Sequence, residues 1–303
     1  MALFVRVDPF QRFVSCLVFA PRDRYDTELR LRFQEILTHA WGGTLAAYYT
    51  HLDDSPLARL QFYVETPPGG VPAVDAEAVE RRLVEAARSW SDRLEAALSV
   101  GRDEAEAVRL VRRYAEAFPT AYRDHFLEQE AVADLLRVEE ALTNGGLALS
   151  LYRPLEAPEH RLRFKIFATG EPAPLSQVVP VLENMGFRVL GEVPYRLRPA
   201  GVGTPVWMRE FHLETADAAT VDLESVREPF HDAFRQVWVG TLENDGFNRL
   251  VLGAGLPARE VTVLRAYCKF LRQARMPFSQ AYVEQTLASQ PRIARYSIPP
   301  AAT

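Results

Sequence analysis

Residues 253–258 read Gly-Ala-Gly-Leu-Pro-Ala and match GxGxxA, the spacing of a loop that holds the phosphates of a dinucleotide. Such a loop follows a strand and opens a helix, and an acidic residue for the ribose comes about 20 residues later. Here that distance reaches Arg272 and Arg275 in a helical pattern, with no second strand. We therefore interpret the segment as a turn between two helices with Pro257 at the first helical position. A weak nucleotide site of its own at Gly253–Ala258 is an alternative.

Other patterns of catalytic or metal-binding residues are missing from the sequence. Its six histidines show no HxxxH or HExxH spacing, so a metal site would need ligands from distant segments. There is no GxSxG motif, no P-loop and no Cys/His pair. Neighbouring carboxylates such as Glu139 and Glu140 fall on solvated helix faces. We predict no catalytic residue and no metal site in this chain.

The junction between the first predicted strand and the first predicted helix is the candidate ligand-binding position. Residues 13–20 form the strand, and the helix begins near residue 27. A helix N-terminus carries free N–H groups and a partial positive charge, which suit a small carboxylate. A capped turn with solvated arginines is the alternative. The predicted ligand-binding residues are Arg22, Asp23, Arg24 and Thr27.

A second polar segment begins at residue 244. It combines Asn, Asp and Gly, which favour turns, with an aromatic residue that needs burial. We interpret it, together with polar residues of the helix that follows, as a structural joint between domains. The predicted joint residues are Asn244, Asp245, Phe247, Asn248, Arg249, Arg259, Glu260 and Arg265.

The order β-α-β-β-α occurs twice in the predicted elements, which indicates an α+β fold of two tandem ferredoxin-like units. The first copy has strands at residues 13–20, 44–51 and 58–65, a helix before Gly42, and one long helix with an apolar stripe from Val79 to Leu98. The second copy has strands at 161–167, 187–198 and 206–214, with helices near 175–185 and 223–238. Similar residues recur at a nearly constant offset: Val74-Asp75 with Val221-Asp222, and Trp90 with Trp238.

Helices fill the rest of the predicted chain. Two amphipathic helices, at 102–118 and 127–142, form an acidic insert between the copies, and the strand at 147–152 could complete the first unit. Two further helices, at 257–275 and 279–290, follow the second copy. The two units could join their sheets edge to edge or pack them face to face, which would cover exposed edges and apolar faces.

Composition narrows the classes of partner. The chain has 303 residues, a formal net charge of −5 and a pI of about 5.8, which disfavours a nucleic-acid groove. No apolar run approaches the ~20 residues of a membrane helix, and no signal-peptide pattern follows the first residue. The two cysteines have no partner at CxxC spacing. We expect a cytoplasmic protein that binds neither nucleic acid nor membrane.

Several long motifs resemble one family. Asp8–Tyr25 (DPFQRFVSCLVFAPRDRY) and Asn244–Leu252 (NDGFNRLVL) resemble segments of the large NAD-specific glutamate dehydrogenases of bacteria. Residues 194–197, 207–213 and 259–273 are also similar, so the resemblance spans nearly the whole chain. One departure lies at residues 256–258, where the family tends to carry an aromatic residue beside the arginine. The larger departure is length, because this chain resembles only the N-terminal regulatory part, and we expect a fragment.

The resemblance implies two ACT-like modules at residues 1–100 and 147–240, a helical insert at 101–146, and a helical segment at 241–303 that leads toward an absent catalytic region. For the whole enzyme it implies oxidation of L-glutamate with NAD. Such chemistry uses accessible lysines. The only two here, Lys165 and Lys269, lie on an alternating strand and a helix stripe, so we expect the reaction and any cofactor outside this segment.

The expected role is therefore regulation and assembly. The expected partners are the catalytic region of the same subunit, further copies in a homo-oligomer, and an amino-acid effector. A free-standing ACT-like sensor that acts on a separate partner is the alternative, and an open reading frame that ends near Thr303 would favour it.

Overall fold

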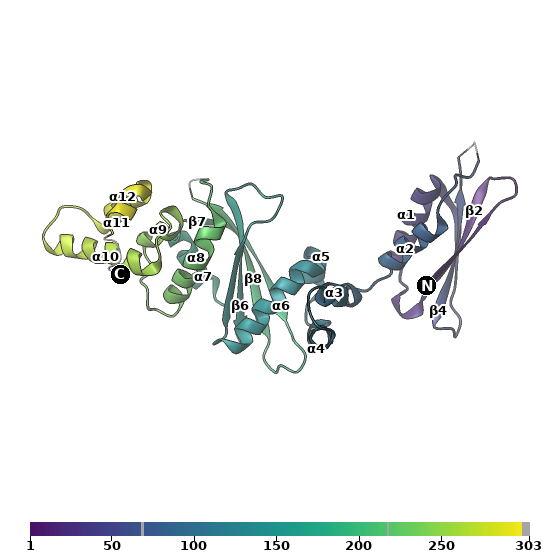
Figure 1. The fold of residues 1–303 in the computed structure, drawn as a ribbon, viewed down its shortest axis with the longest axis horizontal. Coiled ribbons are helices and arrows are strands. Elements are labelled where there is room, and N and C mark those ends of the chain that lie inside the picture. The colour runs from purple at the N-terminus through teal and green to yellow at the C-terminus, as the bar shows by residue number, and fades with distance from the viewer. Residues whose placement is uncertain (68–69, 217, 299–303) are drawn as a thin grey trace. The chain divides into compact units, whose positions relative to one another are not determined.

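The computed structural model describes residues 1–67, 70–216 and 218–298 and divides the chain into two compact units, Met1–Val100 and Gly101–Thr303 (Figure 1). Each unit contains one four-stranded antiparallel sheet with helices. This confirms the α+β class and the tandem arrangement. The finer division of the second unit, at residues 146 and 240, stays a prediction.

The sheet of the first unit has the strand order β1-β2-β4-β3. The elements are β1 (Ala2–Val7), β2 (Phe13–Pro21), the short 3-10 helix η1 (Arg22–Arg24), α1 (Thr27–Trp41), β3 (Thr44–His51), β4 (Leu57–Glu65) and α2 (Ala76–Ala86). Helices α1 and α2 cover one face of this sheet (Figure 1). The core between them comes from alternate strand residues, such as Val14, Cys16 and Val18, packed against Phe33 and Leu37. Burial raises the pKa of the Cys16 thiol to about 12, which makes it unreactive.

The fourth strand of this sheet excludes one possibility that the sequence left open. Residues 147–152 do not complete the first unit, because that position belongs to β1, which pairs along its length with β2. Only a short turn joins β1 to β2, so pairing them closes a far shorter loop than pairing with residue 147. We missed β1 because it is six residues long and lies at the N-terminus.

The predicted long helix after the first sheet is also wrong. It is two helices, α2 (Ala76–Ala86) and α3 (Trp90–Ser99). Ser89 stops the first and caps the second: its hydroxyl accepts from the Asp92 N–H at 3.1 Å, and the Asp92 carboxylate accepts from the Ser89 N–H at 2.9 Å. This is a capping box, which satisfies N–H groups that are left free at the start of α3.

The end of α1 shows why two glycines stand together there, as predicted. Gly42 has φ +61, the left-handed conformation that closes a helix, and its N–H bonds to the His39 carbonyl. A Cβ on Gly43 would lie 2.2 Å from the carbonyl oxygen of Glu65. The first glycine permits the turn, and the second permits the next strand to approach β4.

The second unit repeats this architecture. Its strand order is β5-β6-β8-β7, built from β5 (Leu147–Tyr152), β6 (Arg161–Thr169), α7 (Leu175–Asn184), β7 (Phe187–Leu197), β8 (Val206–Thr215) and α8 (Leu223–Trp238). Both third strands carry an irregularity at the same place, between Leu45 and Ala47 and between Val189 and Gly191. Each repeat also has one strand before the predicted β-α-β-β-α order. The shared bulge supports common descent of the two copies.

Helices cover both faces of the second sheet. Helices α7 and α8 pack on one face, and α6 (Glu128–Thr143) lies across the other (Figure 1). The insert has three helices rather than the predicted two, because α4 (Glu104–Tyr114) ends early and Pro119 starts a separate α5 (Thr120–His125). The C-terminal part consists of η2 (Gly246–Asn248), α9 (Arg249–Gly253), α10 (Ala258–Gln273), α11 (Gln280–Ser289) and α12 (Pro291–Tyr296).

A buried histidine of α8 makes the second unit sensitive to pH. His231 accepts a hydrogen bond at Nε2 from the Leu151 N–H at 3.0 Å, so it must be neutral at that atom. Burial, helped by Arg235, lowers its pKa from 6.5 to about 3. In the unfolded chain the same histidine binds a proton below about pH 6.5. Its stabilising contribution is therefore present above pH 6.5 and is lost as the pH falls toward 3.

We expect the free energy of unfolding of the second unit to fall by up to ~1.4 kcal/mol per pH unit between pH 6.5 and 5 because of this group. The variant His231→Gln keeps an acceptor for the Leu151 N–H but cannot titrate, so it should lose less stability over the same range. Urea unfolding at pH 7.5, 6 and 5 measures the difference. Equal slopes for both proteins would contradict the assignment.

Candidate functional site

The junction predicted to bind a ligand is a capped turn in the structure. Arg22, Asp23 and Arg24 form η1, and Thr27 is the first residue of α1. The Asp26 carboxylate caps α1 by accepting from the Leu29 N–H at 2.7 Å. The two arginines also have partners: Arg24 pairs with Asp92 at 2.7 Å, and Arg22 donates to the carbonyl of Asp53. Ligand binding by these residues stays a prediction.

The GxGxxA segment lies between two helices. Helix α9 ends at Gly253, and α10 begins at Ala258 with Pro257 as its N-cap, one residue outside the predicted position. In the residues described after β8, only helices and turns follow. The segment therefore lacks the strand that a dinucleotide loop requires on its N-terminal side.

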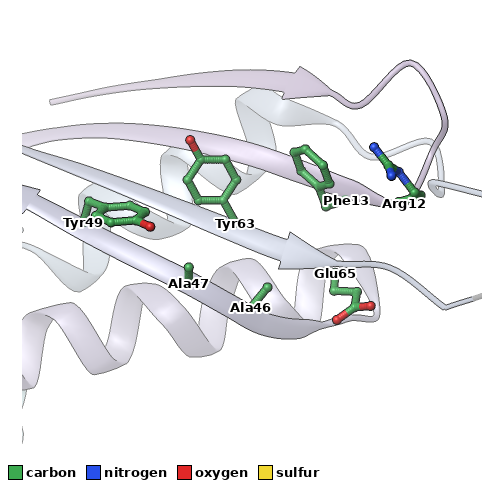
Figure 2. Close-up of a pocket in the computed structure, with 7 residues that line it drawn as sticks. All are labelled: Arg12, Phe13, Ala46, Ala47, Tyr49, Tyr63 and Glu65. Carbon is green, nitrogen blue, oxygen red and sulfur yellow. The ribbon is translucent and has the colours of Figure 1, made fainter.

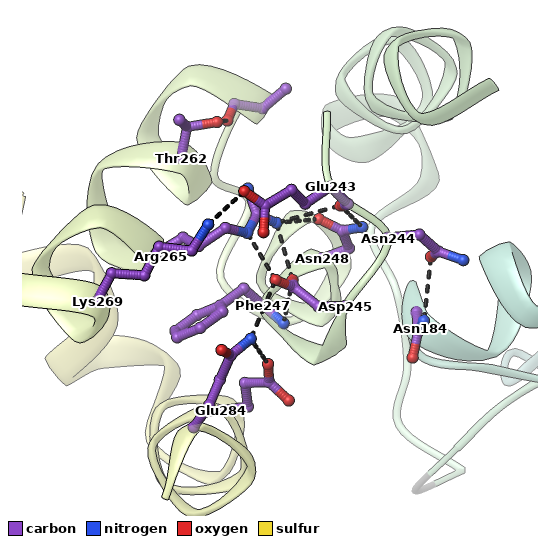
Figure 3. A network of polar contacts seen from close by, with 12 residues as sticks. Asn184, Glu243, Asn244, Asp245, Phe247, Asn248, Thr262, Arg265, Lys269 and Glu284 are labelled. Carbon is purple, nitrogen blue, oxygen red and sulfur yellow. Dashed lines mark hydrogen bonds and ion pairs between the residues drawn. The ribbon is translucent and has the colours of Figure 1, made fainter. Parts of the chain in front are cut away.

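Most of the predicted joint residues come together in one network (Figure 3). Arg265 of α10 is buried and donates to both oxygens of Asp245, from Nε at 2.7 Å and from Nη2 at 2.8 Å. Its Nη2 also lies 2.9 Å from Oδ1 of Asn248. Phe247 is fully buried, with the guanidinium 5.9 Å from its ring centre. A bidentate, charge-assisted pair of this kind locks orientation as well as distance.

The network reaches helices on two sides. Asn184 of α7 donates to Asn244 at 3.0 Å, and Gln280 of α11 donates to Asp245 at 3.4 Å (Figure 3). Asn248 donates to the Glu243 carbonyl at 2.9 Å. The joint therefore ties the second sheet's helix layer to the C-terminal helices within one unit.

Three predicted joint residues lie outside this network. Arg249 is exposed and packs against Gly186, at the end of α7. Arg259 is exposed on the first turn of α10, and Glu260 is half-buried beside it. The ion pair of Lys269 with Glu243 belongs to the network and was missed.

A buried ionic cluster in the second unit was also missed. Lys165 of β6 is 2% exposed, and its Nζ lies 2.6 Å from Oδ2 of Asp134 on α6. Tyr122 donates to the same oxygen at 2.7 Å, and Nζ lies 4.0 Å from the centre of the Phe126 ring. Burial raises the pKa of Asp134, and the Lys165 charge opposes that rise. The strict alternation of β6 predicts that Lys165 points to the outer face of the sheet. That face is buried because α6 packs on it, which the sequence of β6 does not reveal.

Beside this cluster lies a cavity of about 370 Å³. Glu210 of β8, 6% exposed, forms one wall; its carboxylate accepts from the Tyr152 hydroxyl, and His212 Nε2 lies 3.5 Å away. Burial raises the pKa of Tyr195 to about 12, so its hydroxyl stays protonated. The lining residues are His125, Phe126, Glu130, Tyr152, Pro154, Arg163, Val193, Tyr195, Glu210 and His212.

The corresponding face of the first sheet carries aromatic rings in place of the ionic cluster (Figure 2). Phe13, Tyr63 and Tyr49 lie in a row across β2, β4 and β3, with ring centres 5.8 Å and 6.1 Å apart. They line a shallow cavity of about 670 Å³ together with Ala46, Ala47, Arg12 and Glu65. We call this the aromatic surface. It lies on the face of the first sheet opposite α1 and α2.

Strand registers show how the two repeats diverged. Leu17 pairs with Gln61 in the first sheet, and Lys165 with Glu210 in the second, at matching positions. Two residues away on the same strands and the same face, Ser15 and Tyr63 correspond to Arg163 and His212. An aromatic face in the first copy is therefore a face with a buried ionic cluster, covered by α6, in the second.

Comparison with known families explains this architecture. The family models described as "Glutamate dehydrogenase, ACT2 domain" and "Glutamate dehydrogenase, ACT3 domain" match residues 2–91 and 146–226. The models for helical motifs 2 and 3 of the same enzyme match residues 97–141 and 242–297. The chain belongs to the NAD-specific glutamate dehydrogenase family. Its second unit thus combines helical motif 2, which carries the cover over the sheet, with an ACT domain and helical motif 3.

Relatives from three organisms agree. The chain is 42% identical over 293 residues to an NAD-specific glutamate dehydrogenase of Halomonas elongata, 37% to one of Pseudomonas aeruginosa, and 38% over 315 residues to one of Mycobacterium tuberculosis. Each alignment covers 97% of this chain but only 18–19% of the relative. The chain therefore spans less than a fifth of the length of these glutamate dehydrogenases. Among the residues described, no helix has the length and hydropathy needed to cross a bilayer.

Proposed function

We propose that this chain is the regulatory and assembly region of a large NAD-dependent glutamate dehydrogenase. The whole enzyme would oxidise L-glutamate with NAD to 2-oxoglutarate, ammonia and NADH in the cytoplasm. The joint carries this proposal, because Asn184 of the second ACT domain donates to Asn244, and the Arg265–Asp245 pair holds the turn that follows Asn244 to α10. A change in that unit would pass through the joint to the catalytic region of the same subunit.

The surroundings of the two lysines support a catalytic site outside this chain. Lys165 is buried against Asp134, and Lys269 pairs with Glu243. A lysine that acts as an acid or base must reach the substrate and lose its proton readily. Both ammonium groups are already engaged by a carboxylate of this chain, so neither is free to meet a substrate. We therefore place catalysis and NAD binding outside these residues.

Regulation is tested on the full-length enzyme, with the rate of NADH formation titrated against a panel of amino acids. We expect at least one amino acid other than glutamate to change the rate, and the conservative joint variant Arg265→Lys to weaken that response while NAD affinity stays the same. Arg259→Lys, an exposed change on the same helix, is the control. No response to any amino acid in the wild-type enzyme would contradict the sensing role.

Assembly into a homo-oligomer is supported by the aromatic surface, because an aromatic row on an open sheet face favours association. We expect the double variant Tyr49→Glu/Tyr63→Glu to lower the molar mass measured by light scattering, relative to the wild-type chain. Leu31→Glu, an exposed change on α1, is the matched control. A wild-type chain that stays a single copy at all concentrations would contradict self-assembly through this region.

A further inference from the structure

We infer that the cavity between the outer face of the second sheet and α5–α6 binds a free α-amino acid through both its carboxylate and its ammonium group. The inference concerns the site and the ligand class, and its biological meaning rests on the proposed regulatory function. The site differs from the strand–helix junction at Arg22 to Thr27, where Arg22 and Arg24 already have protein partners.

The cavity has the size and construction of a small-molecule site. Its volume of about 370 Å³ falls at the lower end of the ~300–1,000 Å³ typical of ligand pockets. All four strands of the second sheet contribute residues to its walls. The helical insert contributes His125, Phe126 and Glu130. A ligand there would touch helical motif 2 and the ACT domain together.

One wall offers a cation that has no partner among the described residues. Arg163 of β6 is half-buried, and no ion pair or hydrogen bond of its side chain is found among residues 1–67, 70–216 and 218–298. The other basic residue nearby, Lys165, is neutralised by Asp134. A guanidinium presents two parallel N–H donors, which match a carboxylate. Arg163 is therefore the group that would hold the ligand's carboxylate.

Glu210 places a negative charge near Arg163. Glu210 and Arg163 lie diagonally across β8 and β6, because Arg163 pairs with His212 in the register. Diagonal neighbours on one sheet face have Cβ atoms ~7–8 Å apart or slightly less. Glu210 accepts from Tyr152, yet a carboxylate has about four acceptor positions. An ammonium group can therefore bind Glu210 while the same molecule's carboxylate meets Arg163.

A ligand with only a negative or only a positive charge does not match the cavity. A simple anion would bring its charge near Glu130 and Glu210, and a simple amine would lie near Arg163. A zwitterion avoids both conflicts. Phe126, Pro154 and Val193 provide an apolar part of the wall for the ligand's side chain. The first unit has Ser15 and Gln61 at the matching positions, so we expect one such site per chain.

Calorimetry of the 303-residue chain with the common L-amino acids tests the inference. We expect binding of at least one amino acid with one site per chain, and no binding of the matching amine without the carboxylate or acid without the ammonium. The variant Arg163→Gln should weaken binding roughly tenfold or more, since it loses a charge-assisted pair. Arg161→Gln, two residues away on the same strand and exposed, should bind like the wild type.

A second variant tests the ammonium end. Glu210→Gln still accepts from Tyr152 but loses the charge, so it should weaken binding while its thermal unfolding stays close to that of the wild type. Unchanged affinity of either cavity variant would overturn the site. If the full-length enzyme responds to an amino acid that the chain does not bind, the site is wrong and the regulatory role stands. If the chain binds an amino acid but the enzyme does not respond, the regulatory role fails instead.

Discussion

Replacing Asp134 with Leu should lower the free energy of unfolding of the second unit by about 3–5 kcal/mol, because it removes the carboxylate that the buried Lys165 ammonium contacts. The Lys165 side chain is 3% exposed and reaches no water from that position. Tyr122 loses its acceptor at the same time. Urea unfolding followed by far-UV circular dichroism at pH 7.5 measures the loss.

The matched control is Glu116→Leu, which removes an exposed carboxylate from an ion pair with Arg123. Exposed pairs contribute about 0–1 kcal/mol, so the control should stay near the wild type. The double variant Asp134→Leu/Lys165→Met removes both charges and should recover most of the stability, as apolar replacements of buried pairs often do. A double variant as unstable as Asp134→Leu would show that shape, and not the unpaired charge, dominates.

Replacing Arg265 with Met should free α10 from the turn at residues 243–248, through which the C-terminal helices contact α7, at a cost of about 3–5 kcal/mol for the broken buried pair. Asp245 and Asn248 would lose the donor that holds them, and Asn248 is fully buried. Hydrogen exchange should therefore speed up across residues 243–290 while β6 and β8 keep their protection. Mass spectrometry of peptides from the exchanged chain resolves these two regions.

Two further variants define the cause. Arg265→Lys keeps the charge but loses the two parallel donors, so it should fall between wild type and Arg265→Met. Arg259→Met changes an exposed arginine on the same helix and should leave exchange unchanged. Uniformly faster exchange in the sheet as well as the helices would mean that Arg265 stabilises the whole unit and is not a local joint.

The two ACT units illustrate how one fold can take on two roles. Their strand orders and the bulge in the third strand are the same, but the outer face holds Phe13 and Tyr63 in one and Arg161 and His212 in the other. In the second unit α6 covers that face. This difference lies on a face that the core does not constrain, since the core residues lie on the opposite side of each strand.

Prediction succeeded where the evidence was local. Alternation in residues 161–167, the glycines at 42 and 43, and the turn residues at 244–249 each depend on a few neighbouring residues, and the structure confirms these elements. The interruption at Ser89 also had a local signal, because Ser89 and Asp92 have capping-box spacing. The apolar stripe from Val79 to Leu98 continues across this cap, so it predicts one helix where the cap indicates two.

The sequence by itself determined the repeated order of strands and helices and the family, because periodicity, turns and motifs are carried by adjacent residues. Only the tertiary structure decided that residues 147–152 pair in the second sheet and that Lys165 meets Asp134, 31 residues away. Likewise, Tyr152 meets Glu210 across 58 residues. Such contacts depend on which face a helix covers, and burial then decides whether a charge is solvated or must find a partner.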